Sequence, residues 1–183
     1  NLPKQFIDWG CWTLFGKTLE RVKKSIFDYP IITTNSLYLN LVTKHLKKHK
    51  IKKYKIILEP LKKNTAPAIL CPALLKDIPD DKPMIFFSSD NLIGNTSHFN
   101  KSINLHKKYL NENNIFVFGI KPISPSSEYG YFLTKKISKN LNKVSKFIEK
   151  PNKAKLKIIL KKRAYMNSGM FFIRKDSIIR NFK

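Results

Sequence analysis

The stretch MIFFSSDN, residues 84–91, joins an apolar run to a polar turn that carries a single carboxylate, Asp90. A short, continuous apolar run bounded by turn residues is typical of a buried strand. Five further runs rich in Ile, Phe and Val have the same character, at residues 31–33, 54–58, 115–118, 144–148 and 170–173. Residues that follow the strands of a parallel sheet gather at one edge, where ligands bind. Asp90 is therefore predicted to lie at a ligand-binding edge.

Longer stretches of mixed polarity separate these apolar runs. Residues 18–27, 36–49 and 96–111 repeat Leu, Phe or Ile at spacings of three and four, which predicts helices. Strands that alternate with helices favour an α/β domain with a mixed, mainly parallel sheet between helical layers. Neither a linker nor an internal repeat divides the chain, so residues 1–183 are treated as one partial domain.

Composition excludes several classes of protein. The chain has 183 residues, 42% of them hydrophobic, which is enough to bury a core. Its two cysteines, Cys11 and Cys71, cannot form a disulfide scaffold, and no secretory signal pattern is present, so a reducing, cytoplasmic location is expected. No apolar stretch approaches the roughly 18 residues that a membrane span requires, so no membrane partner is expected.

The formal net charge of +24 raises the question of nucleic-acid binding. However, 32 of the 36 basic residues are lysines, whereas sequence-specific nucleic-acid readers depend on bidentate arginine. Lys, Ile and Asn are over-used throughout, as the codon bias of an A/T-rich genome would produce. The densest basic run, residues 44–55, is predicted to be a solvated helix face, and no nucleic-acid partner is expected.

Two of the polar segments that follow predicted strands offer groups that can bind a metal ion or a ligand. Asp90 provides the carboxylate expected of a Mg²⁺ ligand, although an Asp after a strand can also be a turn residue or helix cap. Glu59 and Pro60 end another strand, and residues 64–68 (NTAPA) turn into a helix. These hydrogen-bonding groups can contact a ligand or form an ordinary capped helix start.

Three further segments carry groups that can contact a ligand. Gly130 lets a ligand approach the backbone closely, though it can equally be a loop glycine. Glu149 and Lys150 pair an acid with a base, suited to a hydroxyl and a phosphate respectively, or form a surface ion pair of little energetic value. Asn167 supplies an amide just before a strand, either to a ligand or to a turn.

The order of these segments resembles that of the bacterial mannose-1-phosphate guanylyltransferases. The matching segments are residues 3–6, 18–21, 57–60 with 64–68, 89–90, 118–122, 129–131, 147–151 and 167–171. The resemblance implies the Rossmann-like, three-layer αβα fold of nucleotide-diphospho-sugar transferases. It also implies that GTP and mannose 1-phosphate react in the presence of Mg²⁺ to give GDP-mannose and pyrophosphate.

The resemblance assigns roles to individual residues. Lys4 would face the triphosphate, and Asp90 would bind Mg²⁺, so these two are the expected catalytic residues. The expected nucleotide-binding residues are Glu59, Pro60, Asn64, Thr65, Ala66 and Ser89. The expected sugar-phosphate-binding residues are Gly130, Glu149, Lys150 and Asn167.

The chain also departs from the pattern it resembles. The Gly-x-Gly-Thr-Arg loop would precede Pro3 and a second magnesium aspartate would follow Lys183, so we expect a fragment truncated at both ends and inactive alone. Asn91 stands where histidine is usual, and Met166 where tryptophan is usual. Three alternatives stay open: a sugar-1-phosphate nucleotidyltransferase of other specificity, an inactive fragment and a regulatory homologue. A homo-oligomer is compatible with each.

Overall fold

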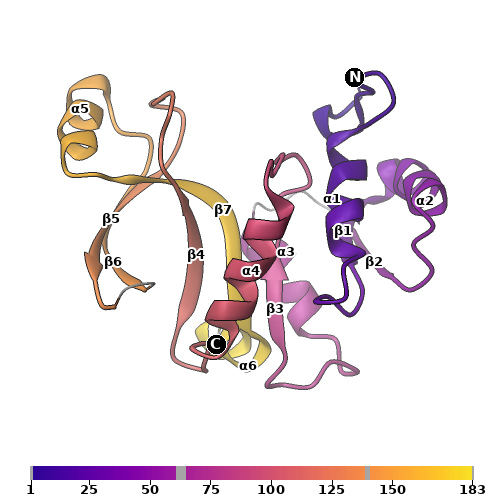
Figure 1. The fold of residues 1–183 in the computed structure, drawn as a ribbon. Coiled ribbons are helices and arrows are strands. Elements are labelled where there is room, and N and C mark those ends of the chain that lie inside the picture. The colour runs from indigo at the N-terminus through magenta and orange to yellow at the C-terminus, as the bar shows by residue number, and fades with distance from the viewer. Residues whose placement is uncertain (1, 61–64, 139–140, 183) are drawn as a thin grey trace. The chain divides into compact units, whose positions relative to one another are not determined.

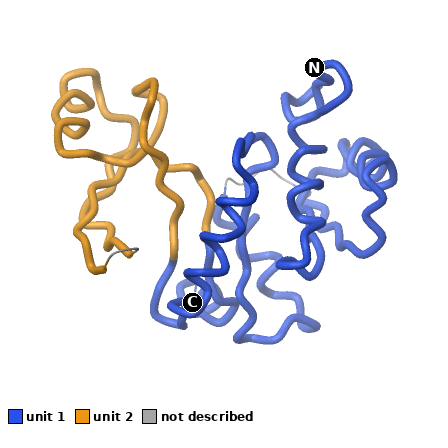
Figure 2. Tube along the Cα trace, viewed as in Figure 1, with its two compact units in different colours: residues 1–115, 172–183 blue, residues 116–171 orange. Residues whose placement is uncertain are grey.

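The computed structural model describes residues 2–60, 65–138 and 141–182 (Figure 1). It divides into two compact units, which are described separately here (Figure 2). Unit 1 comprises Asn1–Ile115 and Phe172–Lys183, and unit 2 comprises Phe116–Phe171. Asn64, one of the predicted nucleotide-binding residues, lies outside the described residues.

The first unit contains most of the helices. Its elements are η1 (Lys4–Phe6), α1 (Leu14–Val22), β1 (Ile31–Asn35), η2 (Ser36–Tyr38), α2 (Leu39–Lys48), β2 (Lys55–Glu59), α3 (Thr65–Ala73), β3 (Pro83–Phe86), α4 (Thr96–Lys107) and α6 (Lys175–Asn181). Side-chain caps fix two of the helix starts. Thr13 accepts a hydrogen bond from the Gly16 amide before α1, and Asn95 accepts one from the His98 amide before α4.

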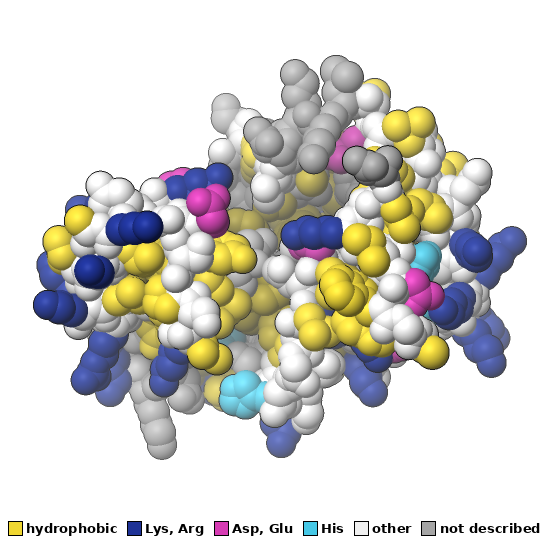
Figure 3. Space-filling view, turned by 90° about the horizontal axis from the view of Figure 1, so that it is seen from above, with side chains coloured by type: hydrophobic (Ala, Val, Ile, Leu, Met, Phe, Trp, Pro, Cys, Tyr) yellow, Lys and Arg dark blue, Asp and Glu magenta, His cyan; other side chains and the backbone are white. Residues whose placement is uncertain are grey.

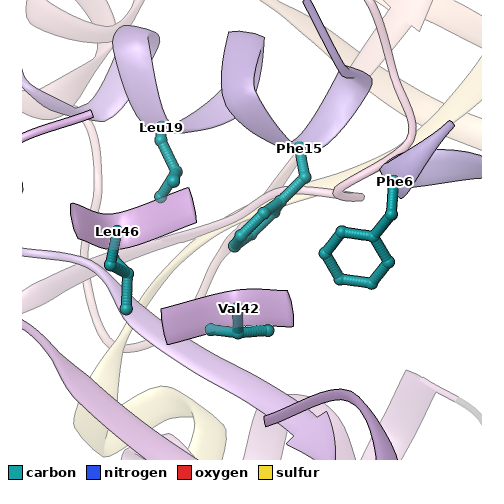
Figure 4. Close-up of a cluster of buried hydrophobic side chains, with 5 residues drawn as sticks. All are labelled: Phe6, Phe15, Leu19, Val42 and Leu46. Atoms are coloured by element: carbon teal, nitrogen blue, oxygen red, sulfur yellow. The ribbon is translucent and has the colours of Figure 1, made fainter. Parts of the chain in front are cut away.

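A cluster of apolar side chains joins the first two helices of unit 1 (Figure 4). Phe15 and Leu19 lie four residues apart on α1, and Val42 and Leu46 lie four residues apart on α2, so each pair shares one face of its helix. Phe6, from η1, completes the cluster. The parallel strands β1 and β2 contribute Ile32 and Ile56, which pack against it.

The second unit is built on antiparallel strands. It contains β5 (Tyr131–Lys136), β6 (Asn142–Ile148) and α5 (Lys153–Lys161), together with most of β4 (Ile115–Ile120) and β7 (Tyr165–Arg174). Strands are hydrogen-bonded in the order β3-β7-β5-β6, and β4 also pairs with β7. Buried side chains from two of these strands, from α5 and from the segment that follows it form the core of the unit, and they are Tyr131, Ile148, Leu156, Ile159 and Ala164.

The α/β fold class predicted from the sequence is confirmed, and its strand pairing is mixed. Parallel pairing joins β1 and β2, but β5 pairs antiparallel with both β6 and β7, so the mainly parallel pattern does not extend to these strands. All six predicted strands are present, whereas β5 was not predicted because its sequence, YFLTKK, is apolar only in its first half.

The predicted helices are present with shifted bounds. The helix expected at residues 18–27 is α1, which begins earlier because Thr13 caps it and ends at Val22. The stretch 36–49 divides into η2 and α2, and the stretch 96–111 forms α4, which ends at Lys107. Helix α5 was not predicted, because four lysines in KAKLKIILK interrupt its apolar positions.

The basic side chains on the surface shown in Figure 3 are dispersed. On the face shown in Figure 3, Lys and Arg side chains are spread out rather than gathered in one continuous patch. Across residues 2–60, 65–138 and 141–182, no helix is both long and apolar enough to cross a membrane.

Candidate functional site

Lys4 and Asp90 form an ion pair in unit 1, with 2.6 Å between Lys4 Nζ and Asp90 Oδ2. Lys4 begins η1, which is anchored by the buried ring of Phe6, and Asp90 lies in the turn after β3. The Lys4 side chain is 70% exposed and the Asp90 side chain only 23%. The lysine is therefore able to swing toward a ligand while the carboxylate stays in place.

Ser88 fixes the other oxygen of the same carboxylate, because its hydroxyl donates a hydrogen bond to Asp90 Oδ1. Partial burial alone would raise the pKa of Asp90. The hydrogen bonds from Lys4 and Ser88, with the positive charge of Lys4, outweigh that effect and lower the pKa below its ordinary value of 3.8. Asp90 is therefore ionised at neutral pH. Ser89 lies between these two residues in the same turn.

A third residue, Arg21, contacts both ends of this turn. Its Nη2 donates to the backbone oxygen of Asn91 at 3.1 Å, and its guanidinium carbon lies 5.4 Å from the centre of the Phe87 ring. Sequence reasoning assigned it no function. One signal was present, because Arg21 follows Thr18 by three residues and so continues the buried face of α1.

Four of the six predicted nucleotide-binding residues, Glu59, Pro60, Thr65 and Ala66, lie at the carboxyl end of β2 and the start of α3. Glu59 ends β2, where its backbone oxygen accepts a hydrogen bond from Asn35 Nδ2 at 3.2 Å. Pro60 follows, and Thr65 and Ala66 form the exposed first turn of α3. The role of this segment in nucleotide binding stays a prediction.

Gly130, Glu149 and Asn167 come together in unit 2, although up to 37 positions separate them in the sequence. Tyr131 pairs with Ile148 on one side and with Met166 on the other, both antiparallel. Continuing this register by one residue places Gly130 between Glu149 and Asn167. The backbone amide of Asn167 accordingly donates a hydrogen bond to the Gly130 carbonyl oxygen at 2.8 Å.

Gly130 makes room for the carboxylate beside it. A Cβ atom at this position would lie 2.7 Å from Glu149 Oε2 and 2.8 Å from Phe147 Cζ, both closer than such atoms approach. Tyr131 holds the preceding loop, because its hydroxyl donates to the Ser126 carbonyl at 2.9 Å and accepts from the Ser126 amide at 3.1 Å. Glycine is therefore required for the close approach of Glu149.

Lys150 lies in the bend that follows β6, whereas Asn167 lies within β7 and not just before a strand, where the sequence predicts it. Lys150 has a φ of 38°, in the left-handed region, directly after Glu149. The Asn167 side-chain oxygen accepts a hydrogen bond from the Gly169 amide at 3.1 Å, and Gly169 has a φ of 70°. The structure therefore brings Asn167 close to Gly130 and Glu149. Its side-chain oxygen also accepts the hydrogen bond of a local turn, which is one of the two roles that the sequence suggested for this residue.

The donor atoms near Asp90 determine which metal site is chemically reasonable. Among the described residues, no three His, Cys, Asp or Glu side chains gather closely enough to hold a metal ion. Asp90 alone provides one ionised, partly accessible carboxylate. Mg²⁺ is commonly held by one or two carboxylates together with water and substrate phosphates. The residues present therefore fit Mg²⁺ shared with a bound triphosphate, but not a metal cage built from protein alone.

The chain is similar in sequence to one known protein family and to several characterised proteins. The family model described as Nucleotidyl transferase matches residues 1–182. A mannose-1-phosphate guanylyltransferase of Klebsiella pneumoniae is 32% identical over 94% of the chain and 38% of its own length. The alginate biosynthesis protein AlgA of Pseudomonas fluorescens is 29% identical over 100% of the chain and 39% of its own length. The chain thus spans about two fifths of the length of these relatives.

A solved structure gives a matching backbone. The crystal structure titled mannose-6-phosphate isomerase from Helicobacter pylori superposes with a TM-score of 0.86 at 30% sequence identity. The match covers 99% of this chain and 69% of that one. The arrangement of elements described above is therefore shared with a protein of known structure.

Proposed function

The chain belongs to the nucleotidyl transferase family, and we propose on this basis that its complete protein forms GDP-mannose and pyrophosphate from GTP and mannose 1-phosphate. The proposal is carried by the chain-wide similarity to a mannose-1-phosphate guanylyltransferase, 32% identical over 94% of the chain. In this reaction a phosphate oxygen of mannose 1-phosphate attacks the α-phosphorus of GTP. The bond from that phosphorus to the bridging oxygen breaks, and pyrophosphate leaves.

Lys4 supplies mobile positive charge to this reaction. Phosphoryl transfer depends mainly on positioning the reactants and neutralising charge on the transferring phosphate. The ammonium group rests on Asp90 at 2.6 Å and is largely exposed, so it moves to a phosphate oxygen of GTP when the nucleotide arrives. Lys4 thereby offsets negative charge that builds up on the triphosphate.

Asp90 becomes available to Mg²⁺ once Lys4 has moved away. Its lowered pKa keeps it ionised, and the Ser88 hydroxyl holds its other oxygen in a fixed direction. Bound Mg²⁺ would neutralise phosphate charge and orient the triphosphate for in-line attack. Asp90 and Ser88 hold this position on the turn after β3, and Ser89 offers its polar groups to the nucleotide from the same turn.

The group in unit 2 suits the sugar phosphate. Glu149 accepts hydrogen bonds from sugar hydroxyls, and Lys150 attracts the phosphate. Gly130 allows the Glu149 carboxylate to lie against the backbone, and Asn167 is held beside it by its backbone hydrogen bond to the Gly130 carbonyl. The nucleotide base is assigned to the segment at the end of β2 and the start of α3, which comprises Glu59, Pro60, Asn64, Thr65 and Ala66.

A second candidate function is a sugar-1-phosphate nucleotidyltransferase with another base or sugar. The Gly130, Glu149 and Asn167 group favours it, because carboxylate and amide groups can hydrogen-bond the hydroxyls of many sugars. Both candidates use the same bond changes and the same Lys4 and Asp90 chemistry.

The test measures pyrophosphate release by the full-length protein with mannose 1-phosphate and GTP, ATP, UTP or TTP in turn. We expect GTP to give the highest kcat/KM, and Mg²⁺ to be required. A clear preference for another nucleotide would refute the guanylyl assignment and favour the second candidate. Substituting glucose 1-phosphate for mannose 1-phosphate at saturating GTP then separates the sugar specificity from the base specificity.

A further inference from the structure

Arg21 touches both flanks of the turn that carries Asp90. It donates to the Asn91 carbonyl at 3.1 Å, and its guanidinium lies over the ring of Phe87 at 5.4 Å. These two residues immediately bracket residues 88–90. From this juxtaposition we propose that Arg21 is a positioning residue that fixes the backbone of the turn and thereby aims Asp90. Its effect on catalysis rests on the proposed function, whereas its effect on the turn does not.

Helix α1 links both partners of the Lys4–Asp90 pair. Near its first turn, the Phe15 ring packs edge-on against Phe6, with 5.4 Å between ring centres, and Phe6 belongs to the same short helix as Lys4. In its last turn, Arg21 holds the turn that bears Asp90. One helix, α1, therefore contacts both the short helix that carries Lys4 and the turn that carries Asp90.

The surroundings of Arg21 are poorly suited to a role in stability alone. Its side chain is only 3% exposed, and its Nε and Nη1 have no hydrogen-bond partner within the described residues. Burial lowers the pKa of the guanidinium, because the charged form loses its hydration. Burying an uncompensated charge is unfavourable, and an apolar side chain of similar length often folds as well or better. Methionine at this position is therefore expected to fold.

The first experiment uses the full-length protein without any ligand. Hydrogen exchange of the amides of residues 88–91 is measured in wild type, Arg21→Met and Arg21→Lys, together with the thermal midpoint of each. We expect exchange at least about tenfold faster in Arg21→Met, since a charge-assisted hydrogen bond is lost, with an unchanged or higher thermal midpoint. Lysine is not expected to restore protection, because an ammonium group lacks the flat fork that stacks on Phe87 while donating to Asn91.

Arg180→Met provides the matched control. Arg180 also donates to a backbone carbonyl, that of Glu112 at 2.8 Å, and it does not touch residues 87–91 in any described contact. We expect exchange of residues 88–91 to be unchanged in this variant. Equal exchange in Arg21→Met and wild type would overturn the proposal, and so would a large fall in the thermal midpoint of Arg21→Met, which would show a structural role.

The second experiment measures the Mg²⁺ concentration at half-maximal pyrophosphate release. We expect it to rise at least about threefold in Arg21→Met and to stay unchanged in Arg180→Met. If the wild-type protein releases no pyrophosphate with any nucleotide and sugar phosphate, the proposed function fails, while faster exchange in Arg21→Met still supports the positioning role.

Discussion

Replacing Asp90 with asparagine removes one negative charge while keeping the size and shape of the side chain. The asparagine oxygen is still able to accept the hydrogen bond from Ser88. The pairing with Lys4 at 2.6 Å is lost, and the neutral amide is a much poorer ligand for Mg²⁺ than the carboxylate. The substitution therefore tests the charge of Asp90 rather than its packing.

The expected effects on stability and activity differ greatly in size. Lys4 is 70% exposed, so the ion pair contributes only about 0–1 kcal/mol to the free energy of unfolding. Losing a preorganised group that stabilises charge in a transition state costs about 10²-fold or more in turnover. Asp90→Asn is therefore expected to fold nearly as well as wild type and to lose at least about 99% of its activity.

The assay is pyrophosphate release by the full-length protein with GTP and mannose 1-phosphate over a range of Mg²⁺ concentrations, with urea unfolding of the same samples. Asp28→Asn is the matched control, because Asp28 also pairs with a lysine, Lys82, at 2.6 Å. We expect the control to keep full turnover. Near-normal turnover of Asp90→Asn at saturating Mg²⁺ would refute the assignment and leave Asp90 as a turn residue.

Three other predictions concern separate parts of the chain. Gly130→Ala should raise the KM for the sugar phosphate about tenfold while costing less than about 1 kcal/mol in stability, because the new methyl group displaces the flexible end of Glu149 and the exposed ring of Phe147. An unchanged KM would contradict the binding role. Lys175→Met should lower the free energy of unfolding by about 2–4 kcal/mol, because the buried ammonium group donates to two loop carbonyls that would lose their partner. Urea titrations measure this change, and a loss below about 1 kcal/mol would contradict the prediction. Burial lowers the pKa of His49 below its ordinary value of 6.5, so the stability it contributes is present above pH 6.5 and is lost as pH falls through 6.5 toward the folded-state pKa. The stability difference between wild type and His49→Gln should therefore shrink between pH 7.5 and pH 5, and a constant difference in urea titrations at the two pH values would show that His49 does not titrate on unfolding.

Local sequence patterns determined the α/β class and the place of most elements. Continuous apolar runs such as residues 84–87 and 115–118 predicted strands correctly, because short apolar runs bounded by turn residues favour extended structure, but the structure leaves β3 half-buried and both ends of β4 exposed. Spacings of three and four mark helices because those residues share one helix face. Boundaries were less certain, as α1 shows, because a cap such as Thr13 fixes the start of a helix independently of the apolar pattern.

Only the tertiary structure decided which distant residues meet. The apolar pattern of β5 is weak, and yet the register of this strand with β6 and β7 is what places Gly130 between Glu149 and Asn167. Likewise, 70 positions separate Arg21 from Asn91, and a chain pattern gives no sign that a helix arginine contacts that turn. Periodicity records how each segment is buried, whereas partners across the fold are chosen by packing between segments. For this reason sequence reasoning identified Lys4 and Asp90 separately. Only the folded chain shows that they form an ion pair and that buried Arg21 contacts the turn that carries Asp90.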